Sequence, residues 1–362
     1  MDAELERIVL AAGQAPSGDN TQPWRFTVDP AARLVTPHLD ESRDRSPMNA
    51  GQRMARIALG AAIENLVRAA GDFGWTAEAE HGRGASAAAV HFSGRGGAPG
   101  KACELIRARV TNRRVFDGKA IPTDRVGRLA LEVQEFNGVS THWIVAKDRI
   151  SALAQVIGRA DATMFGEPSM RRAFLANVRF DQPPGAEVAE GLSLDSLELS
   201  SSDRRALRMM PKIPDWLLNV TGATRVFAAK ARELVASASG LCLIVARDRT
   251  PQADLDVGRV MQRAWLALTE QGLAVQPMSS MPVLENAVEN GTPELVAALG
   301  AGKVKSLGDE FRSLAPELGG GRLTFMLRFG FAPAPSGRTG RLPLAAIMSS
   351  TATASPPRPA FP

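Results

Sequence analysis

Two short basic segments of the sequence carry side chains that are suited to binding phosphate. The first, RVTNRRVFDGKAIP, combines basic residues with neutral hydrogen-bonding ones: Arg109, Thr111, Asn112, Arg113, Arg114 and Lys119. The second, PSGRTGRLP, places Arg338 and Arg341 among glycine and threonine. A guanidinium group presents forked donors that match phosphate oxygens, and Thr and Asn add neutral hydrogen bonds. Each segment alone is also typical of a solvated basic surface.

Two other loops combine polar groups with residues that stiffen the backbone. The loop APSGDNTQPW follows an apolar helical run and contains Pro16, Ser17, Gly18, Asn20 and Gln22. Binding groups often lie in such loops between regular elements. The loop VQPMSSMP (275–282) follows a short strand-like run and contains Pro277, Met278, Ser279 and Ser280. Because its prolines cannot donate and hold the backbone rigid, this loop can aim an N–H group at a ligand. Each loop is also typical of an ordinary turn.

The sequence lacks the usual motifs of a protein that performs chemistry with its own side chains. It has no nucleophile elbow, P-loop or Rossmann glycine fingerprint. Two cysteines and four histidines show neither a disulfide framework nor a metal-ligand spacing. We therefore expect a metal-free protein in which a cofactor supplies the chemistry.

Charge and composition argue against nucleic acid and membrane partners. The 43 basic and 38 acidic residues give a net charge of +5, but the arginines are scattered along the chain. Tyrosine is absent and aromatic residues make up 5%, which leaves little for base stacking. The basic excess fits an anionic small molecule better than a polyanion. There is no apolar run of about 18 residues, and the acidic, amphipathic N-terminus is unlike a signal peptide, so we expect a cytoplasmic protein.

Hydrophobic periodicity predicts the elements that must position these loops. Helices are predicted at 3–13, 51–75, 101–110, 123–136 and 254–273, with Thr123 as an N-cap. Strands are predicted at 24–29, 33–40, 86–94, 140–148, 240–248 and 322–333. The remaining segments are a glycine-rich link at 94–100, an irregular helical region at 151–232 and a low-complexity, disordered tail at 346–362.

An internal repeat suggests the architecture. Residues 60–80 align without a gap on residues 258–278, so that Gly60 falls on Gly258 and Gly74 on Gly272. Both copies have the pattern of a helix, a glycine C-cap and a strand. A second match places 23–29 on 142–148. Chance similarity of amphipathic helices is the competing interpretation, but the shared order of the two matches favours a duplication. Only the first copy has the Pro-Ser loop and only the second has the arginine segments.

In this order, the four segments resemble the nitroreductase family of flavoproteins. APSGDNTQPWRF resembles that family's FMN-proximal loop, commonly A-P-S-x-x-N-x-Q-P-W-x-F, although Asp19 stands where related chains often have His. RVTNRRVF resembles its R-x-[ST]-x-R-x-F segment. Residues 258–282 look like the part that places a backbone N–H near flavin N5, and LRFGFAPAPSGRTGRLPL is similar to the terminal phosphate-binding stretch. The whole is similar to the single-chain, duplicated Acg-type branch.

The resemblance implies an α+β, nitroreductase-like fold in which two tandem repeats form an intrachain pseudodimer. The first repeat would occupy 1–98 and the second 99–345, with a lid insertion around 160–225. One FMN per chain would lie between them. Its phosphate would be neutralised by Arg338, Arg341 and the 109–113 arginines. Ser17 and Asn20 would bind the ring edge, and a backbone N–H near Ser279 would face N5. We expect Trp24 to pack in the core rather than contact the ring.

The implied activity is hydride transfer through flavin N5, from NAD(P)H or a substrate to an organic acceptor such as a nitro compound or a quinone. Three alternatives remain at this point. The first is a flavin-dependent dehydrogenase that acts on a biosynthetic intermediate, for example in azoline oxidation. The second is flavin chemistry with O₂. The third is a flavin-binding or flavin-sequestering protein whose lid closes the pocket. The sequence leaves the choice between NADH and NADPH open. A pseudodimer is expected to be satisfied as a monomer.

Overall fold

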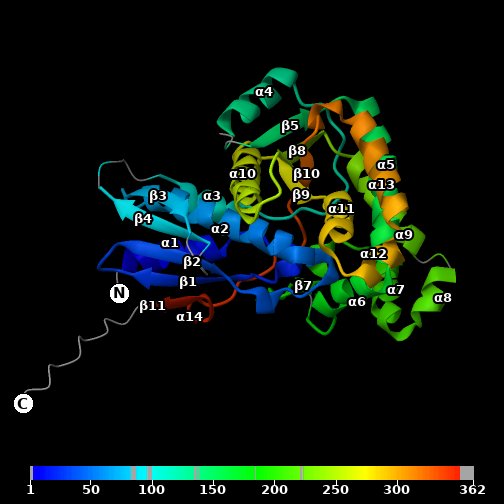
Figure 1. The fold of residues 1–362 in the computed structure, drawn as a ribbon, viewed down its shortest axis with the longest axis horizontal. Coiled ribbons are helices and arrows are strands. Elements are labelled where there is room, and N and C mark those ends of the chain that lie inside the picture. The colour runs from blue at the N-terminus through cyan, green and yellow to red at the C-terminus, as the bar shows by residue number, and fades with distance from the viewer. Residues whose placement is uncertain are drawn as a thin grey trace, which may run out of the picture.

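The computed structural model describes residues 3–350 except 83–86, 95, 97–99, 134–135, 137, 184, 221 and 223. The described chain is a mixed α+β structure with two sheets that lie on either side of a central helix pair (Figure 1). The pair consists of α2 (Arg53–Gly71) and α10 (Pro251–Glu270). The predicted mixed α+β class is therefore confirmed.

The first sheet has the strand order β11-β1-β2-β4-β3. Its strands are β1 (Trp24–Asp29), β2 (Leu34–Leu39), β3 (Thr76–His81), β4 (Ala88–Ser93) and β11 (Met348–Ser350). The pairs among β1 to β4 are antiparallel, whereas β11 adds in parallel to β1. Trp24, Phe26 and Val28 alternate along β1 and are fully buried, as a half-buried strand requires. The expected core position of Trp24 is thereby confirmed.

The second sheet is antiparallel, with the strand order β5-β8-β10-β9. Its strands are β5 (Val139–Ile144), β8 (Gly240–Ala246), β9 (Ala274–Pro277) and β10 (Arg322–Gly330). All residues of β8 and β10 are buried, because these two strands lie inside the sheet between α10 and the helices on the other face. The order matches that of β1 to β4, and each sheet has its long helix between its second and third strands in sequence.

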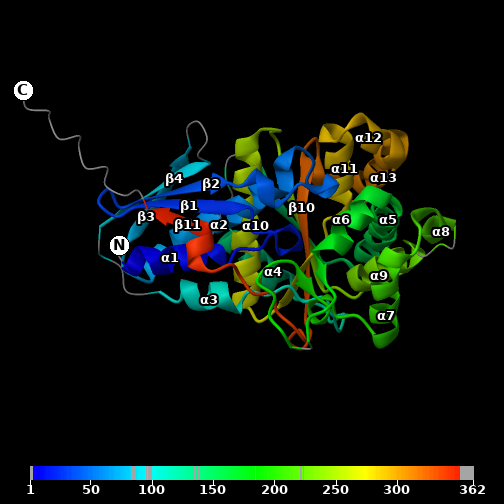
Figure 2. The same cartoon turned by 90° about the horizontal axis from the view of Figure 1, so that it is seen from below.

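The remaining helices surround this frame. They are α1 (Ala3–Gly13), α3 (Ala102–Ala108), α4 (Thr123–Glu132), α5 (Lys147–Gly166), α6 (Pro168–Asn177), α7 (Ser201–Met209), α8 (Asp215–Val220), α9 (Thr224–Ala236), α11 (Ser280–Asn290), α12 (Pro293–Leu299), α13 (Ala301–Leu314) and α14 (Leu344–Ile347). A two-strand ribbon, β6 (Val178–Arg179) with β7 (Leu192–Ser193), lies in the chain between α6 and α7. Helix α1 covers the first sheet with α2, while α5, α9, α11 and α13 pack beside the second sheet (Figures 1 and 2).

The aligned glycines of the sequence repeat occupy matching places. Helix α2 crosses α10 at Gly60 and Gly258, whose backbones touch. After the helices, Gly74 and Gly272 both adopt left-handed backbone angles, with φ of 75° and 69°. Glycine takes these angles without steric cost. The helices predicted at 51–75 and 254–273, and the strand that follows the second, are confirmed.

The C-terminal part of the described chain is more ordered than the sequence suggested. The prediction of disorder from residue 346 is wrong for residues 346–350. Ile347 is 2% exposed, and Met348 pairs with Phe26 at the edge of the first sheet. An edge strand offers unpaired backbone N–H and C=O groups, and β11 pairs with those of β1. Figure 2 shows α14 and β11 beside α1 and β1. Residues 351–362 of the predicted tail lie outside the described residues.

Two further local predictions need correction. Thr123 is the first residue of α4 and not its N-cap, because the extended Pro122 precedes the helix and Thr123 makes no capping bond. The strand predicted at 140–148 ends at Ile144, and α5 begins at Lys147. Asp148 in its first turn suits a helix N-terminus. The match of 23–29 on 142–148 is therefore out of register. The boundary expected at 98/99 lies outside the described residues.

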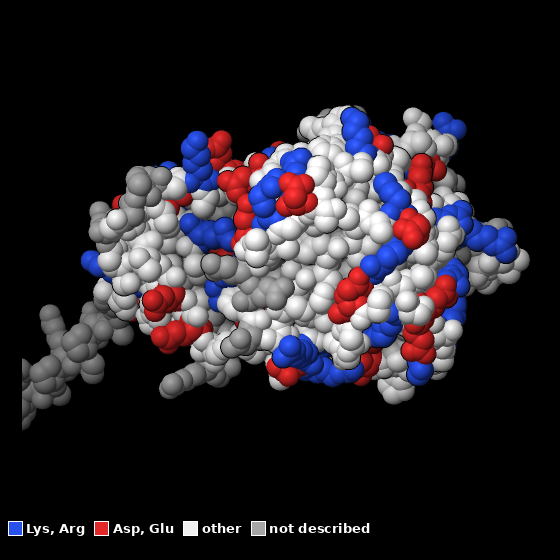
Figure 3. All heavy atoms as spheres, turned by 90° about the horizontal axis from the view of Figure 1, so that it is seen from above, with Lys and Arg blue, Asp and Glu red and all other residues white. Residues whose placement is uncertain are grey.

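Charges of both signs are interspersed on the face shown in Figure 3, without an extended basic stripe. Many of them form ion pairs, for example Arg249 with Glu289 at 2.5 Å and Lys305 with Asp309 at 2.6 Å. Among the described helices, none is long and apolar enough to cross a membrane.

Candidate functional site

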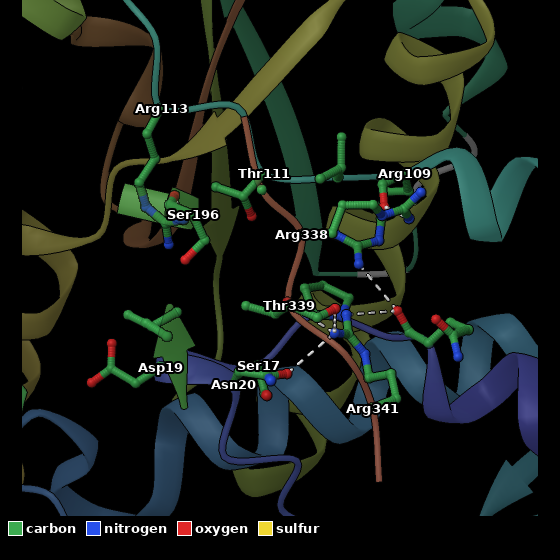
Figure 4. Close-up of a pocket in the computed structure, with 15 residues that line it drawn as sticks. Ser17, Asp19, Asn20, Arg109, Thr111, Arg113, Ser196, Arg338, Thr339 and Arg341 are labelled. Atoms are coloured by element: carbon green, nitrogen blue, oxygen red, sulfur yellow. Dashed lines mark hydrogen bonds between the residues drawn. The ribbon is translucent and has the colours of Figure 1, made fainter. Parts of the chain in front are cut away.

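Three segments that are far apart in sequence meet in one polar pocket (Figure 4). They are the opening loop before β1, the extended segment after α3 and the stretch after β10. Leu192 of β7 and Ser196, which follows it, complete the lining. The pocket is lined by Gln14, Pro16, Ser17, Asp19, Asn20, Arg109, Val110, Thr111, Arg113, Leu192, Ser196, Gly337, Arg338, Thr339 and Arg341. The sequence motifs that were expected to share a site are thus brought together.

Three arginines gather on one side of this pocket and are held by backbone carbonyls. Arg109 donates to the carbonyl oxygen of Gln14 at 3.1 Å, and Arg341 donates to the same oxygen at 3.2 Å. Arg338 donates to the carbonyl oxygen of Arg107. The guanidinium of Arg109 also lies over the Trp265 ring, 4.5 Å from its centroid. Figure 4 shows Arg109, Arg338 and Arg341 close together.

These arginines have no counter-ion in contact. None of the three forms an ion pair with a carboxylate in the described part of the chain. Burial lowers the pKa of Arg109, and the charges of Arg341 and Arg338 lower it further. Burial and then Arg338 lower the pKa of Arg341 to about 10, while Glu187 acts in the opposite direction. Like charges placed close together around a buried member are costly, so a bound anion would remove repulsion at this place.

The donors of the cluster are also incompletely used. The Nε atoms of Arg109 and Arg341 are buried and have no hydrogen-bond partner. The Thr111 side chain lines the same pocket. A phosphate group has enough acceptor oxygens to satisfy several such donors at once. The donor set therefore fits a phosphate better than a carboxylate, which has one oxygen fewer.

A second cavity, of about 160 Å³, adjoins the polar pocket and shares Pro16, Ser17, Asp19, Thr111 and Arg113 with it. Its other walls come from the opening loop, the two central helices, β10 and the loop after β9: Gly18, Met54, Ile57, Ala58, Met261, Trp265, Pro277, Ser279 and Phe325. Apolar walls with a polar edge are typical of a site for a planar ring.

The loop after β9 reaches this cavity through Ser279. Ser279 precedes α11 and lines both this cavity and a third one of about 210 Å³. Its backbone N–H donates to no acceptor among the described residues, whereas that of Met278 donates to the Met326 carbonyl oxygen at 2.9 Å. Ser280 is 2% exposed, and its Oγ meets no hydrogen-bond geometry with a described residue. Free donors at a helix N-terminus favour an electron-rich ligand.

The opening loop has a conformation that few residue types adopt. Asp19, Asn20 and Gln22 all have positive φ, of 45°, 59° and 53°. Non-glycine residues in this region carry strain, which persists where surrounding contacts hold it and is common at binding sites. Here Gln22 holds the loop: its N–H donates to Ser17 Oγ at 3.0 Å and its side chain accepts from Leu342 N–H at 2.9 Å.

Two of the predicted site residues support the pocket without lining it. Gln22 is fully buried and anchors the loop as described. Asn112 donates from its side chain to the Pro333 carbonyl oxygen at 2.8 Å and accepts from Arg114 N–H at 3.1 Å. Arg109, Thr111 and Arg113 line the pocket together with Val110, whereas the Asn112 side chain is directed to the Pro333 carbonyl oxygen.

The stretch between β5 and β8 reaches the polar pocket through one segment and the third cavity through α5 and α6. Its first helix, α5, belongs to the core of the second half. The part near the pocket is residues 188–198, called the covering segment below. Its Ala189 carbonyl accepts from Gln22 Nε2 at 2.7 Å, and its Ser196 carbonyl accepts from Arg113 at 2.8 Å. Glu198 accepts from Ser336 N–H. The lid expected around 160–225 stays a prediction.

Sequence reasoning missed three acidic residues at the third cavity. Asp19 was noted only as a departure, and Asp44 and Asp161 were not noticed. A signal was present for Asp161. It falls on the same stripe of α5 as the buried Ile150, Ile157 and Met164, and a charged residue on an apolar stripe deserves scrutiny.

No known protein-family model matches the sequence. The uncharacterized protein MT1398 of Mycobacterium tuberculosis is 25% identical over 350 residues, which are 91% of this chain and 46% of that protein. The chain thus spans less than half the length of the curated relative that it matches.

Several solved structures resemble parts of the fold. The FMN-dependent nitroreductase NfnB of Mycobacterium smegmatis, in complex with NADPH, is 17% identical with a TM-score of 0.38, over 67% of this chain and 94% of that one. An FMN- and NADPH-dependent NfnB from sphigopyxis sp. strain HMH is 16% identical with a TM-score of 0.37, over 68% and 96%. An iodotyrosine deiodinase bound to FMN and 3-iodo-L-tyrosine is 14% identical with a TM-score of 0.35, over 66% and 92%. At such low TM-scores the likeness carries no functional argument.

Proposed function

We propose that the chain binds one FMN between its two halves and is an FMN-dependent oxidoreductase of the nitroreductase type. The observation that carries the proposal is the cluster of Arg109, Arg338 and Arg341, which lines the pocket beside the opening loop and has no carboxylate partner among the described residues. Arg109 is buried, Arg341 is half-buried and Arg338 is exposed. The loop motif APSGDNTQPWRF, which resembles an FMN-proximal loop, borders the same pocket. When bound, FMN supplies hydride transfer at N5 of its ring.

The residues present fit the cofactor in three places. The three arginines and Thr111 would hold the phosphate, because their donors converge there and are partly unused. Ser17 accepts from Gln22 N–H, so its own hydroxyl proton is free to be donated to the ring edge. The unpaired N–H of Ser279 would be directed at the ring atom that accepts hydride and would stabilise negative charge there.

Asn20 has a different role in this proposal from the one that the sequence suggested. Its side chain accepts from Arg341 at 3.2 Å and donates to the carbonyl oxygens of Ala189 and Gly340, each at 3.3 Å. It therefore links the arginine cluster to the covering segment. We assign the ring-edge contacts to Ser17 and Arg113, which line both the polar pocket and the ring cavity.

We infer further that the two halves are duplicated units that form a pseudodimer. Two observations support this: the shared strand order of the sheets, and the reciprocal contact of Gly60 and Gly258. A duplicated chain with the loop in one half and the arginines in the other would hold a single FMN.

In this proposal, NADH or NADPH reduces the flavin, and a small organic molecule such as a nitro compound or a quinone is the acceptor. A second function, flavin binding with little turnover, is favoured by one observation. The covering segment is tied to the opening loop through Ala189 and to the stretch after β10 through Glu198. These contacts would have to break before a large acceptor reached the ring.

The absorbance spectrum of the purified protein tests cofactor binding. We expect flavin bands as isolated or after addition of FMN, with one FMN per chain by titration. A protein that stays colourless with excess FMN overturns the site assignment. Anaerobic mixing with NADPH, and separately with NADH, then distinguishes the two functions. Bleaching within seconds supports a reductase, and a flavin that stays oxidised for minutes with both donors supports the binding function.

A further inference from the structure

A third cavity lies next to the proposed ring site and carries an unusual set of charges. It has a volume of about 210 Å³ and shares Asp19, Arg113 and Ser279 with the ring cavity. Its charged lining side chains, among the described residues, are Asp19, Asp44, Asp161 and Arg113. Three carboxyl groups therefore face one guanidinium.

The three carboxyl groups come from separate elements and form no ion pair in the described part of the chain. Asp19 lies in the opening loop and accepts from Asn177 Nδ2 at 3.2 Å. Asp44 follows the hairpin of β1 and β2, is 7% exposed, and accepts from Ser46 N–H at 3.1 Å. Asp161 lies on α5. Burial raises the pKa of Asp161 to about 7 and that of Asp44 to about 6.

The rest of the cavity wall is largely apolar, and its uncharged polar side chains are Ser46, Asn49, Gln276, Ser279 and Ser280. The apolar residues are Met48, Met54, Met164, Phe165, Phe174, Pro277, Met278 and Val283. Ser280 Oγ is buried and lines the cavity; it meets no hydrogen-bond geometry with a described residue, but it lies near enough to Asp161 to lower the pKa of that carboxyl. An unpartnered buried polar atom costs free energy unless a ligand satisfies it. The wall thus offers a place for an apolar body and a polar end that is rich in acceptors.

We propose that this cavity binds a substrate with an apolar body and a protonated amine, with the ammonium group among Asp161, Asp44 and Ser280. Burial lowers the pKa of Arg113, and the negative charge of Asp19 acts in the opposite direction. The guanidinium of Arg113 therefore compensates the charge of one carboxylate, that of Asp19. The other two carboxyl groups have no cation beside them, and burying them unpaired is unfavourable. An ammonium group would supply the missing charge and three donors. The proposal deepens the proposed function and rests on it only for the claim that the cavity adjoins the flavin ring.

The test is direct binding of matched probes by titration calorimetry, with and without FMN. The probes are phenethylamine, its neutral analogue 2-phenylethanol and the anionic phenylacetate. At pH 8 we expect phenethylamine to bind at least about tenfold tighter than 2-phenylethanol. This preference should shrink toward pH 5, because Asp161 and Asp44 become protonated while Arg113 stays charged. Equal binding of amine and alcohol at pH 8, or tighter binding of phenylacetate, overturns the proposal.

Matched variants locate the probe. Asp161→Asn and Asp44→Asn should each reduce the affinity for phenethylamine at pH 8 about tenfold and leave that for 2-phenylethanol within twofold. Asp148→Asn, an exposed position on the same helix, should change neither. If neither cavity variant alters amine binding, the site is elsewhere and the assignment is wrong. FMN binding, followed by absorbance in the same samples, is a separate readout. Amine binding without FMN binding would overturn the proposed function alone, and the reverse would overturn this inference alone.

Discussion

Gly60 and Gly258 lie against each other where α2 crosses α10, and each glycine makes the same close contact in the other helix. A Cβ on Gly60 would lie 2.0 Å from the Leu255 carbonyl oxygen, and one on Gly258 would lie 2.0 Å from the Ile57 carbonyl oxygen. The sequence repeat also aligns Ile57 with Leu255. The contact is therefore reciprocal, as in a two-fold interface between identical surfaces.

This relationship predicts a large loss of stability on a small substitution. In Gly60→Ala and in Gly258→Ala the new methyl group meets backbone, so the helices must separate, and we expect a loss of about 2 kcal/mol or more in the free energy of unfolding. Urea unfolding measures it. Gly71→Ala, at the end of α2 with open space around it, is the control and should change stability by less than about 1 kcal/mol. Unchanged unfolding of both crossing variants would contradict the close approach.

The arginine cluster predicts opposite effects on the free and FMN-bound protein. Arg338→Ala or Arg341→Ala removes a donor to the phosphate, so we expect FMN affinity to fall at least about tenfold, or 1.4 kcal/mol. The same change relieves repulsion between like charges, so the stability of the FMN-free protein should not fall in proportion. Fluorescence titration with FMN and thermal unfolding measure the two effects.

Arg205→Ala serves as the control for the cluster, since Arg205 is exposed and remote from the three pockets. It should leave FMN affinity unchanged. Inorganic phosphate should raise the unfolding temperature of the FMN-free wild type but not of the double variant Arg338→Ala/Arg341→Ala. Equal FMN affinity in the double variant and wild type would remove this stretch from the phosphate site.

The half-buried Asp161 predicts a specific pH dependence of stability. Burial raises its folded pKa to about 7, above the unfolded value of about 3.9. The folded chain therefore holds the proton more tightly. The resulting stabilisation is complete below about pH 4 and is lost as the pH rises to about 7, by at most roughly 1.4 kcal/mol per pH unit.

Asp161→Asn removes this titration while keeping the shape of the side chain. Relative to wild type, the variant should gain in free energy of unfolding between about pH 4 and pH 7 and keep a constant difference above that. Urea unfolding at several pH values, without ligands, measures the difference. A difference that does not change with pH would show that Asp161 has an ordinary pKa.

The covering segment predicts slow release of FMN. Glu198 accepts from Ser336 N–H and lies 3.6 Å from Arg114, so it fastens this segment to the stretch after β10. In Glu198→Gln the charge is lost, and we expect FMN dissociation to accelerate several-fold with little change in the association rate. Stopped-flow displacement measures both rates. Glu132→Gln, at an exposed position on α4, is the control. An unchanged dissociation rate would mean that this contact does not limit release.

Much of the fold could be predicted because its signals are local. The apolar period of α2 and α10 and the glycines that follow them fix both helices and the strands after them. Where the chain changes direction within a few residues, prediction was less accurate. The segment from Ile144 to Asp148 was taken as strand because it continues an apolar run through Ala146, but α5 begins at Lys147. Residues 346–350 were taken as disordered because their order depends on a distant partner, the edge of β1.

The sequence by itself determined the types of group at the site and the elements that carry them: the arginines, the polar loop and the repeated helix–glycine–strand unit. These follow from side-chain chemistry and from periods of a few residues. Only the tertiary structure decided which of them meet. It turned Asn112 away from Thr111, tied Asn20 to Arg341 and Ala189, and brought Asp161 to Asp44. Such contacts join residues separated by a hundred positions or more, and no local pattern records them, because they depend on how whole elements pack.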